Sequence, residues 1–223
     1  MSVLFKTTPQ TSAKICGLST PEAVDSALGG GASFIGFVFF EKSPRDVNPE
    51  TAARLAAGAR SSNVKTVALL VDPSNAHLDE IMGKLKPDFI QLHGHETPAR
   101  VQEVKMRTGA GLIKAVPVST SLEVAHAARD YDTFADHLMF DAKPPEDAER
   151  PGGNGVAFDW EILHGLRLER PWFLAGGLDP WNVGEAIKRS GAKMVDVSSG
   201  VERGAGLKDP ALITAFLDAV KRV

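Results

Sequence analysis

Short apolar runs alternate with polar, helix-like segments along almost the whole chain. Each run spans four to seven residues, and most are rich in β-branched or aromatic side chains. A short, continuously apolar run is typical of a strand that is buried on both faces, as in a parallel sheet. The pattern predicts eight such strands, at residues 13–16, 34–39, 65–71, 89–92, 112–116, 137–141, 172–175 and 193–197.

The segments between these runs carry the signals of helix ends. Thr20-Pro21-Glu22 combines a hydroxyl N-cap, a proline in the first turn and an acidic residue near the positive end of a helix. The same kind of signal recurs at residues 48–50, 179–180 and 209–210. Glycines at 29–31 and Gly191 indicate where helices end. We therefore expect about eight helices that alternate with the strands.

This alternation favours one α/β domain, a closed (β/α)8 TIM barrel with a parallel eight-stranded sheet inside a ring of outer helices. The 223 residues give about 28 residues per unit, close to the span of a compact βα pair. An open doubly wound sheet is the alternative, but its glycine-rich phosphate-binding turn should follow the first strand, and residues 16–20 lack it. We assign residues 1–12 to a polar tail and residues 13–223 to the barrel.

Charge and cysteine content exclude several classes of protein. The chain has 25 basic and 28 acidic residues, a net charge of −3 and one cysteine. Nucleic-acid binders usually show a basic excess, and one cysteine makes neither an intrachain disulfide nor a cysteine-only zinc site. No apolar stretch is long enough for a signal peptide or a membrane helix. We therefore expect a cytoplasmic protein with no nucleic-acid or membrane partner.

Two reactive side chains end predicted strands, where the reactive groups of a (β/α)8 barrel lie. Cys16 ends the first strand, and Asp141 ends the sixth. The thiolate of Cys16 suits a base or a nucleophile, although a lone cysteine is often only a small buried hydrophobe. Asp141 suits a general acid or a structural carboxylate that holds a loop. These two residues form the candidate catalytic pair.

Glycine and serine residues follow the last two strands, in the loops that commonly bind phosphate in this fold. Gly176 and Gly177 follow the seventh strand, and Ser199 and Gly200 follow the eighth. Backbone N–H groups approach phosphate closely at glycines and at helix N-termini, so such a site needs no cluster of lysines. The glycines could instead only form tight turns, but the two loops together favour a phosphate site.

Three further residues occupy less specific positions. Arg45 follows the second strand, where its guanidinium is either solvated or clamps a substrate carboxylate. His93, at the end of the fourth strand, suits a pocket wall or the core, and Asp196 suits an orienting or a structural role. His93 and His95 have no carboxylate or cysteine partners at metal-ligand spacing, so we expect no metal.

The motifs occur in the order found in a known enzyme family. They lie at residues 14–18 (KICGL), 36–45, 91–94 (QLHG), 140–141, 151–160, 174–178 (LAGGL) and 196–202 (DVSSGVE). Over nearly the whole chain from residue 13 onward, the sequence resembles the phosphoribosylanthranilate isomerases, the (β/α)8 barrels of tryptophan biosynthesis. The full set of motifs is specific, although the glycine pair alone is not.

The resemblance implies an Amadori rearrangement of N-(5-phosphoribosyl)anthranilate to 1-(2-carboxyphenylamino)-1-deoxyribulose 5-phosphate. It implies that Asp141 protonates the furanose ring oxygen and that Cys16 takes the C2 proton of the resulting Schiff base. Arg45 would hold the anthranilate carboxylate, with His93 among the substrate-binding residues and the glycine and serine loops on the phosphate. It implies no metal or organic cofactor, and its partner is a small phosphorylated molecule.

The sequence departs from the family at three loop positions. Family members often carry threonine or serine in place of Asn154, an acidic residue in place of His95 and an aromatic one in place of Asp46. These differences affect details of substrate contact rather than the reaction. The aromatic substrate also predicts an apolar pocket near Phe37 or Phe39, unless both are core residues.

Two other functions remain as alternatives. One is another sugar-phosphate barrel enzyme, such as an epimerase or a bifunctional isomerase that also converts a histidine-pathway substrate. The bifunctional enzymes use a pair of aspartates, whereas the first strand here ends in Cys16. The other alternative is a non-catalytic phosphate-binding barrel, which would have no reason to keep an acid–base pair. The sequence leaves a monomer and a homodimer equally open.

Overall fold

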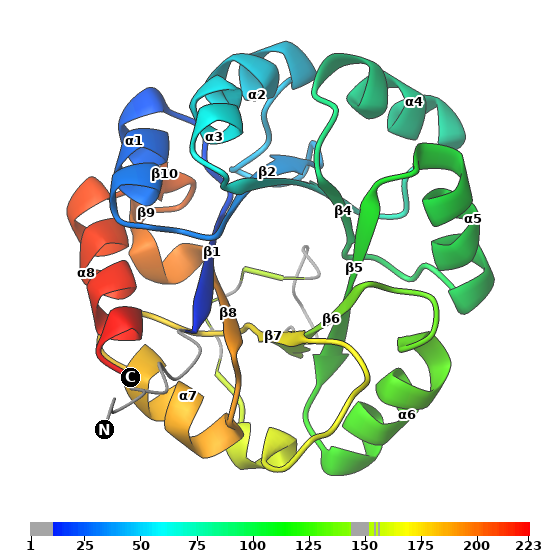
Figure 1. Ribbon diagram of the computed structural model, residues 1–223, viewed down its shortest axis with the longest axis vertical. Helices are drawn as coiled ribbons and strands as arrows, with labels where there is room; N and C mark the ends of the chain where they lie inside the picture. The colour runs from blue at the N-terminus through cyan, green and yellow to red at the C-terminus, as the bar shows by residue number, and fades with distance from the viewer. Residues whose placement is uncertain (1–10, 144–151, 154, 156) are drawn as a thin grey trace, which may run out of the picture.

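Eight parallel strands form a closed barrel that is surrounded by helices (Figure 1). The computed structural model describes residues 11–143, 152–153, 155 and 157–223. Each strand pairs with its neighbours in chain order, and β1 closes the barrel against β8. The strands are β1 (Ser12–Cys16), β2 (Phe34–Phe39), β3 (Lys65–Leu70), β4 (Phe89–Leu92), β5 (Gly111–Val118), β6 (His137–Ala142), β7 (Trp172–Leu174) and β8 (Met194–Val197).

The sheet confirms the predicted (β/α)8 barrel strand by strand. Every predicted strand overlaps an observed one, and their ends differ by no more than two residues. All six residues of β2 are buried, as expected for a strand with the barrel interior on one face and helices on the other. β1 begins at Ser12, one residue earlier than predicted, and residues 1–10 of the predicted tail lie outside the described residues.

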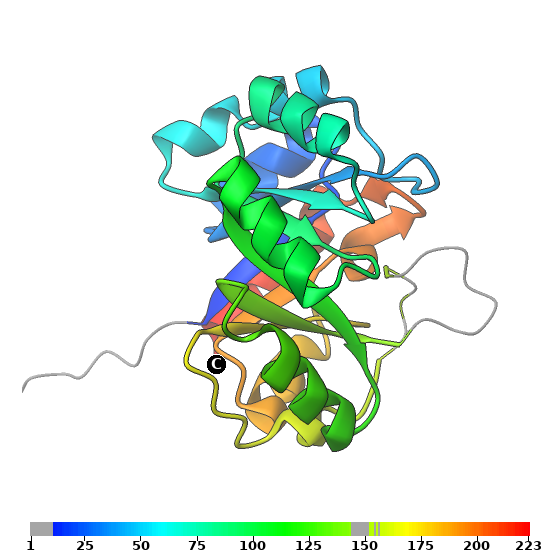
Figure 2. The ribbon, with the colours of Figure 1, turned by 90° about the vertical axis from the view of Figure 1, so that its right-hand side faces the viewer.

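The helices pack around the outside of the sheet. Those described are α1 (Pro21–Gly29), α2 (Pro49–Leu55), α3 (Ala57–Ser61), α4 (Asn75–Lys84), α5 (Pro98–Thr108), α6 (Ser121–Tyr131), α7 (Val183–Ser190) and α8 (Pro210–Lys221), with the 3₁₀ helices η1 (Trp160–Leu163) and η2 (Ser199–Val201). None of the helices described is both long and apolar enough to span a membrane. A small antiparallel hairpin, β9 (Glu202–Gly204) and β10 (Leu207–Lys208), lies at the carboxyl-terminal end of the barrel (Figure 2).

Helix starts mostly follow the predicted capping residues. The side chain of Thr20 accepts a hydrogen bond from the backbone N–H of Ala23, and Asn48 does the same for Thr51. Asp209 caps α8 in the same way. Each cap satisfies a backbone N–H group that has no partner within its helix, which explains why these helices begin where they do.

The chain after β6 and after β7 departs from the prediction. The helix start expected at residues 179–180 was wrong. The side chain of Asp179 accepts hydrogen bonds from the N–H groups of Trp181 and Asn182, as a capping residue does, but residues 180–182 form a turn. Helix α7 begins only at Val183. Between β6 and β7 the described residues contain only η1, a single turn, in place of a full helix.

The barrel interior has an apolar end and a polar end. Near the starts of the strands, the rings of Phe34, Phe89, His137 and Phe173 pack together, with 5.2 Å between the centroids of Phe34 and Phe173. Such edge-to-face packing fills the amino-terminal end of the barrel. The open space inside the sheet is therefore at the carboxyl-terminal end, where the candidate chemistry lies.

Candidate active site

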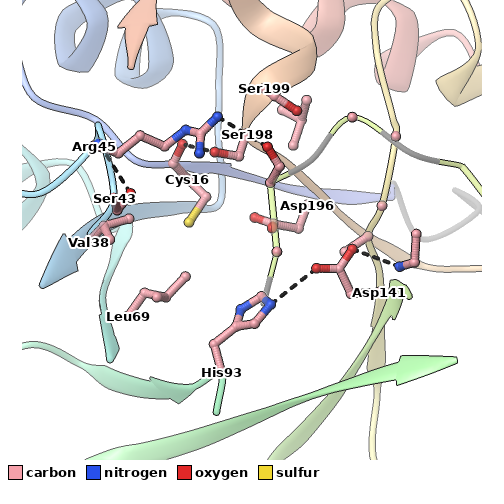
Figure 3. Close-up of a pocket in the computed structure, with 18 of the residues that line it drawn as sticks. Cys16, Val38, Ser43, Arg45, Leu69, His93, Asp141, Asp196, Ser198 and Ser199 are labelled. Atoms are coloured by element: carbon pink, nitrogen blue, oxygen red, sulfur yellow. Dashed lines mark hydrogen bonds and ion pairs between the residues drawn. The ribbon is translucent and has the colours of Figure 1, made fainter. Parts of the chain in front are cut away.

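A cavity that is partly open to solvent lies at the carboxyl-terminal end of the barrel (Figure 3). Seven of the eight predicted site residues line it. The eighth, Gly200, directly follows Ser199 in η2. The seven are Cys16, Arg45, His93, Asp141, Gly176, Gly177 and Ser199. They come from the ends of β1, β4 and β6 and from the loops after β2, β7 and β8, so the fold gathers residues that are far apart in sequence.

Apolar side chains form the wall that β2 and β3 contribute. Val38, Phe40 and Leu69 line the cavity. Phe37 and Phe39 are buried in the core that faces the helices, because successive residues of a strand point to opposite faces. The predicted apolar pocket therefore exists, but the neighbours of these two phenylalanines form it.

Asp141 belongs to a hydrogen-bonded chain with His93 and Gln91 on one side of the cavity. Its Oδ1 accepts a hydrogen bond from the N–H of Ala142 at 2.8 Å, and its Oδ2 lies 3.2 Å from Nε2 of His93. Nδ1 of His93 lies 3.0 Å from Nε2 of Gln91. His93 is therefore part of the cavity wall and not of the apolar core. The described ranges contain no group of three His, Cys, Asp or Glu side chains that could hold a metal ion.

Cys16 lies on another side of the cavity, at the end of β1, and is almost wholly buried. Burial raises the pKa of its thiol, the positive charge of Lys14 opposes this rise, and the negative charge of Asp196 adds to it. Lys14 and Asp196 form an ion pair with 2.8 Å between Nζ and Oδ1. With its pKa raised, the thiol is the resting form at neutral pH, and Cys16 can accept a proton only after it has become a thiolate.

Arg45 is buried and forms an ion pair, so the alternative of a solvated guanidinium was wrong. Its Nε donates to Oε1 of Glu202 at 2.7 Å, and its Nη2 donates to Oε2 at 2.9 Å. Nη1 has no hydrogen-bond partner within the described part of the chain. Burial would raise the pKa of Glu202, but its hydrogen bond with Arg45 and the charge of Lys208 outweigh this effect and lower it. The ionised Glu202 therefore holds the guanidinium in one orientation.

The loops after β7 and β8 bring backbone close to the cavity. Gly176 and Gly177 have φ angles of +85° and +63°, a region that favours glycine. Their N–H groups donate no hydrogen bond within the described residues. Gly200 packs so tightly that a Cβ there would lie 1.9 Å from the carbonyl oxygen of Leu178. Unpaired N–H groups beside a cavity are the donors that a phosphate group requires.

Comparison with known proteins gives the family. The profile of the N-(5'phosphoribosyl)anthranilate (PRA) isomerase family matches residues 13–219. The chain belongs to this family. Among the PRA isomerases, the protein named N-(5'-phosphoribosyl)anthranilate isomerase of Caulobacter sp. (strain K31) is 64% identical over 211 residues, which cover 95% of this chain and 99% of that relative.

Solved structures of PRA isomerases share the barrel. The enzyme from Thermotoga maritima superposes with a TM-score of 0.84 at 32% identity and covers 96% of this chain and 100% of its own. A PRA isomerase in complex with reduced 1-(o-carboxyphenylamino)-1-deoxyribulose 5-phosphate gives a TM-score of 0.80 at 29% identity, with the same coverage of 96% and 100%.

Sequence analysis of this PRA isomerase family member missed two charged residues of the β9–β10 hairpin. Nζ of Lys208 donates to Oε1 of Glu202 at 2.6 Å and to the carbonyl oxygen of Ser198 at 2.9 Å. The pair therefore links the loop after β8 to Arg45. Glu202 lay in a motif without a role attached to it. Lys208 carried no signal, because its partners are defined only once the hairpin has formed.

Proposed function

We propose that the protein catalyses the Amadori rearrangement of N-(5′-phosphoribosyl)anthranilate to 1-(2-carboxyphenylamino)-1-deoxyribulose 5-phosphate, a step of tryptophan biosynthesis. The observation that carries the proposal is a single cavity with a candidate acid and a candidate base on different sides, beside an arginine and two phosphate-type loops. An aldose-to-ketose shift needs an acid at one oxygen and a base at the neighbouring carbon. Membership of the PRA isomerase family supports the same reaction.

Asp141 is the general acid in this mechanism. It gives its proton to the furanose ring oxygen while the bond between that oxygen and C1 breaks, which leaves a Schiff base between C1 and the anthranilate nitrogen. The hydrogen bond from the N–H of Ala142 and the contact with Nε2 of His93 hold the carboxyl group at the cavity wall. Because the geometry of an acid decides whether a proton transfer succeeds, this orientation is part of its role.

Cys16 is the base. Its thiolate removes the proton from C2 of the Schiff base, and the resulting enolamine tautomerises to the ketone. Each of the two proton transfers contributes about 10²–10⁴-fold to the rate. The acid comes from β6 and the base from β1, so each reaches the ribose chain from its own side of the cavity.

The two anionic groups of the substrate have separate partners. Arg45, held by Glu202, keeps Nη1 available for the anthranilate carboxylate, and the unpaired N–H groups of Gly176 and Gly177 are donors for the phosphate. The apolar wall that includes Val38 accommodates the aromatic ring. Because these interactions are local, the net charge of −3 does not oppose an anionic substrate.

The decisive assay follows the fluorescence of N-(5′-phosphoribosyl)anthranilate in the presence of the purified protein. We expect the fluorescence to decay at a rate proportional to protein concentration, with formation of the deoxyribulose product. Binding without decay would identify a non-catalytic phosphate-binding barrel. Formation of a different product would identify another sugar-phosphate enzyme.

A further inference from the structure

A lysine is buried in the barrel directly below the proposed base. Lys14 lies in the middle of β1, two residues before Cys16, so both side chains point to the same face of the strand. Its exposed fraction is 0%, and its ammonium pairs with Asp196 of β8. Burying an ammonium is costly even when it is paired, so its position beside reactive groups calls for a reason.

The ammonium of Lys14 and the thiol of Cys16 border one small space. In the sheet register, Cys16 lies opposite Gly36 of β2. A Cβ on Gly36 would lie 3.1 Å from Sγ of Cys16 and 3.2 Å from Nζ of Lys14. The missing side chain at position 36 therefore lets a full positive charge come next to the sulfur.

Charges on three elements act on the Cys16 thiol. After burial, which raises its pKa, Lys14 has the largest effect and lowers the pKa; Asp196 raises it, and Lys208 of β10 lowers it. The other titratable side chains that line the cavity are Arg45, which follows the neighbouring strand β2 and packs against Gly17, and His93, Asp141 and Lys143, which lie farther around the barrel. Lys14 is thus the principal group that favours the thiolate.

We propose that Lys14 is a positioning residue whose ammonium sets the fraction of Cys16 that is present as thiolate. Lys14 does not line the cavity, so it acts through Cys16 and not on the substrate. The inference rests on the proposed role of Cys16 as the base. A bound carboxylate and phosphate both disfavour a nearby thiolate, and a buried positive charge beside the sulfur offsets them. Asp196 balances the ammonium while Cys16 is a neutral thiol.

The chain contains a matched control for a buried lysine. Lys114 of β5 pairs with Glu96 at 2.7 Å, and the exposed fractions of the two side chains are 3% and 1%. Lys114 does not act on Cys16, since the thiol responds to Lys14, Asp196 and Lys208. Replacing Lys114 therefore carries the structural cost of losing a buried ammonium without the proposed effect on the thiol.

The test uses the single cysteine of the chain, because any thiol reaction reports on Cys16 alone. The rate of alkylation by iodoacetamide is measured against pH for the wild type, Lys14→Met, Asp196→Asn and Lys114→Met. Only the thiolate reacts, so the rate rises with pH through the thiol pKa. We expect Lys14→Met to slow alkylation at pH 7 about tenfold or more, which corresponds to one pKa unit. Lys114→Met should leave the profile unchanged.

Asp196→Asn should act in the opposite direction. Without Asp196, the thiolate is the remaining anion beside the Lys14 ammonium, so alkylation at pH 7 should accelerate about tenfold. This variant decides the matter if Lys14→Met fails to fold, as judged by circular dichroism. The proposal is overturned if Lys14→Met leaves the profile in place, if Lys114→Met moves it equally, or if Asp196→Asn does not accelerate alkylation.

The isomerase assay separates this proposal from the proposed function. A shifted alkylation profile in a protein that does not convert N-(5′-phosphoribosyl)anthranilate would reject the function but keep the effect of Lys14 on the thiol. Full conversion with an unshifted profile would reject only the role of Lys14. In an active enzyme, the rise of kcat/KM with pH should move upward in Lys14→Met by the same amount as the alkylation profile.

Discussion

The two sides of the cavity hold their proposed proton-transfer groups in different ways. Cys16 sits above a buried ion pair between Lys14 and Asp196, so its state depends on full charges. Asp141 sits at the end of a chain of hydrogen bonds through His93 and Gln91. Charge effects fall off slowly with distance, whereas hydrogen bonds weaken steeply with misalignment. The base side should therefore be sensitive to charge changes, and the acid side to small displacements.

The largest expected effects come from removing the two proton-transfer groups themselves. Cys16→Ala and Asp141→Asn should each lower kcat by about 10²–10⁴-fold, because each removes one proton transfer from the reaction. Steady-state kinetics with N-(5′-phosphoribosyl)anthranilate measures the loss. Binding of a non-reacting product analogue should stay within a few-fold of the wild type. A Cys16→Ala variant with wild-type turnover would remove Cys16 as the base and leave only the acid side of the comparison.

Intermediate effects are expected from Arg45 and Glu202, because we propose that Arg45 binds the substrate carboxylate. Arg45→Lys keeps the charge but cannot contact both oxygens of Glu202 and a substrate carboxylate at once, because an ammonium lacks the planar fork of a guanidinium. We expect KM to rise about 10–100-fold, on the order of a charged hydrogen bond, with kcat within a few-fold.

The variant Glu202→Gln tests the same ion pair from the side of the carboxylate. It leaves Arg45 in place but removes the negative charge that orients it, so the rise in KM should be smaller than for Arg45→Lys. It also breaks a buried ion pair, which costs about 3–5 kcal/mol of stability when one partner is lost. Urea unfolding measures this cost separately. An unchanged KM in both variants would show that another group holds the carboxylate.

The strands were predictable because their environment leaves a strong signal. A strand with the sheet interior on one face and helices on the other is apolar throughout, and β2 meets this condition at all six positions. The helix starts at Thr20 and Asn48 were also predictable, because each depends on a capping residue next to the start of the helix. The start at Asp179 failed because a turn at residues 180–182 precedes α7, although Asp179 accepts the same pattern of hydrogen bonds as the Asp209 cap.

The site was predictable only as far as strand ends determine it. The rule that chemistry follows the strands of a barrel gathered Cys16, Asp141 and Arg45 before any contact was known. Their partners were not predictable, because Lys14 and Asp196 are 182 residues apart and Arg45 and Glu202 are 157 residues apart. A pairing at such separation is fixed by the register of the closed barrel and not by any local pattern.

The smallest expected effect comes from Gln91, at the far end of the hydrogen-bonded chain that runs through His93 to Asp141. Gln91 is buried, and its Oε1 has no hydrogen-bond partner in the described structure, while its Nε2 faces Nδ1 of His93. When Asp141 holds the acid proton, Nε2 of His93 must accept it, and Nδ1–H then needs an acceptor. Rotation of the Gln91 amide would supply Oε1 as this acceptor. Gln91 can therefore form a hydrogen bond with Nδ1 of His93 in either neutral form of the imidazole ring.

Gln91→Leu removes this partner while filling similar space. We expect kcat to fall two- to tenfold, the range of one neutral hydrogen bond at about 0.5–1.5 kcal/mol, with KM unchanged. Nitrogen NMR of the His93 ring should show a changed balance between its two neutral forms. Alkylation of Cys16 should keep its pH profile, because Gln91 carries no charge. If Gln91→Leu shifted that profile, the two sides of the cavity would be coupled, and the contrast between a charge-controlled base and a geometry-controlled acid would not hold.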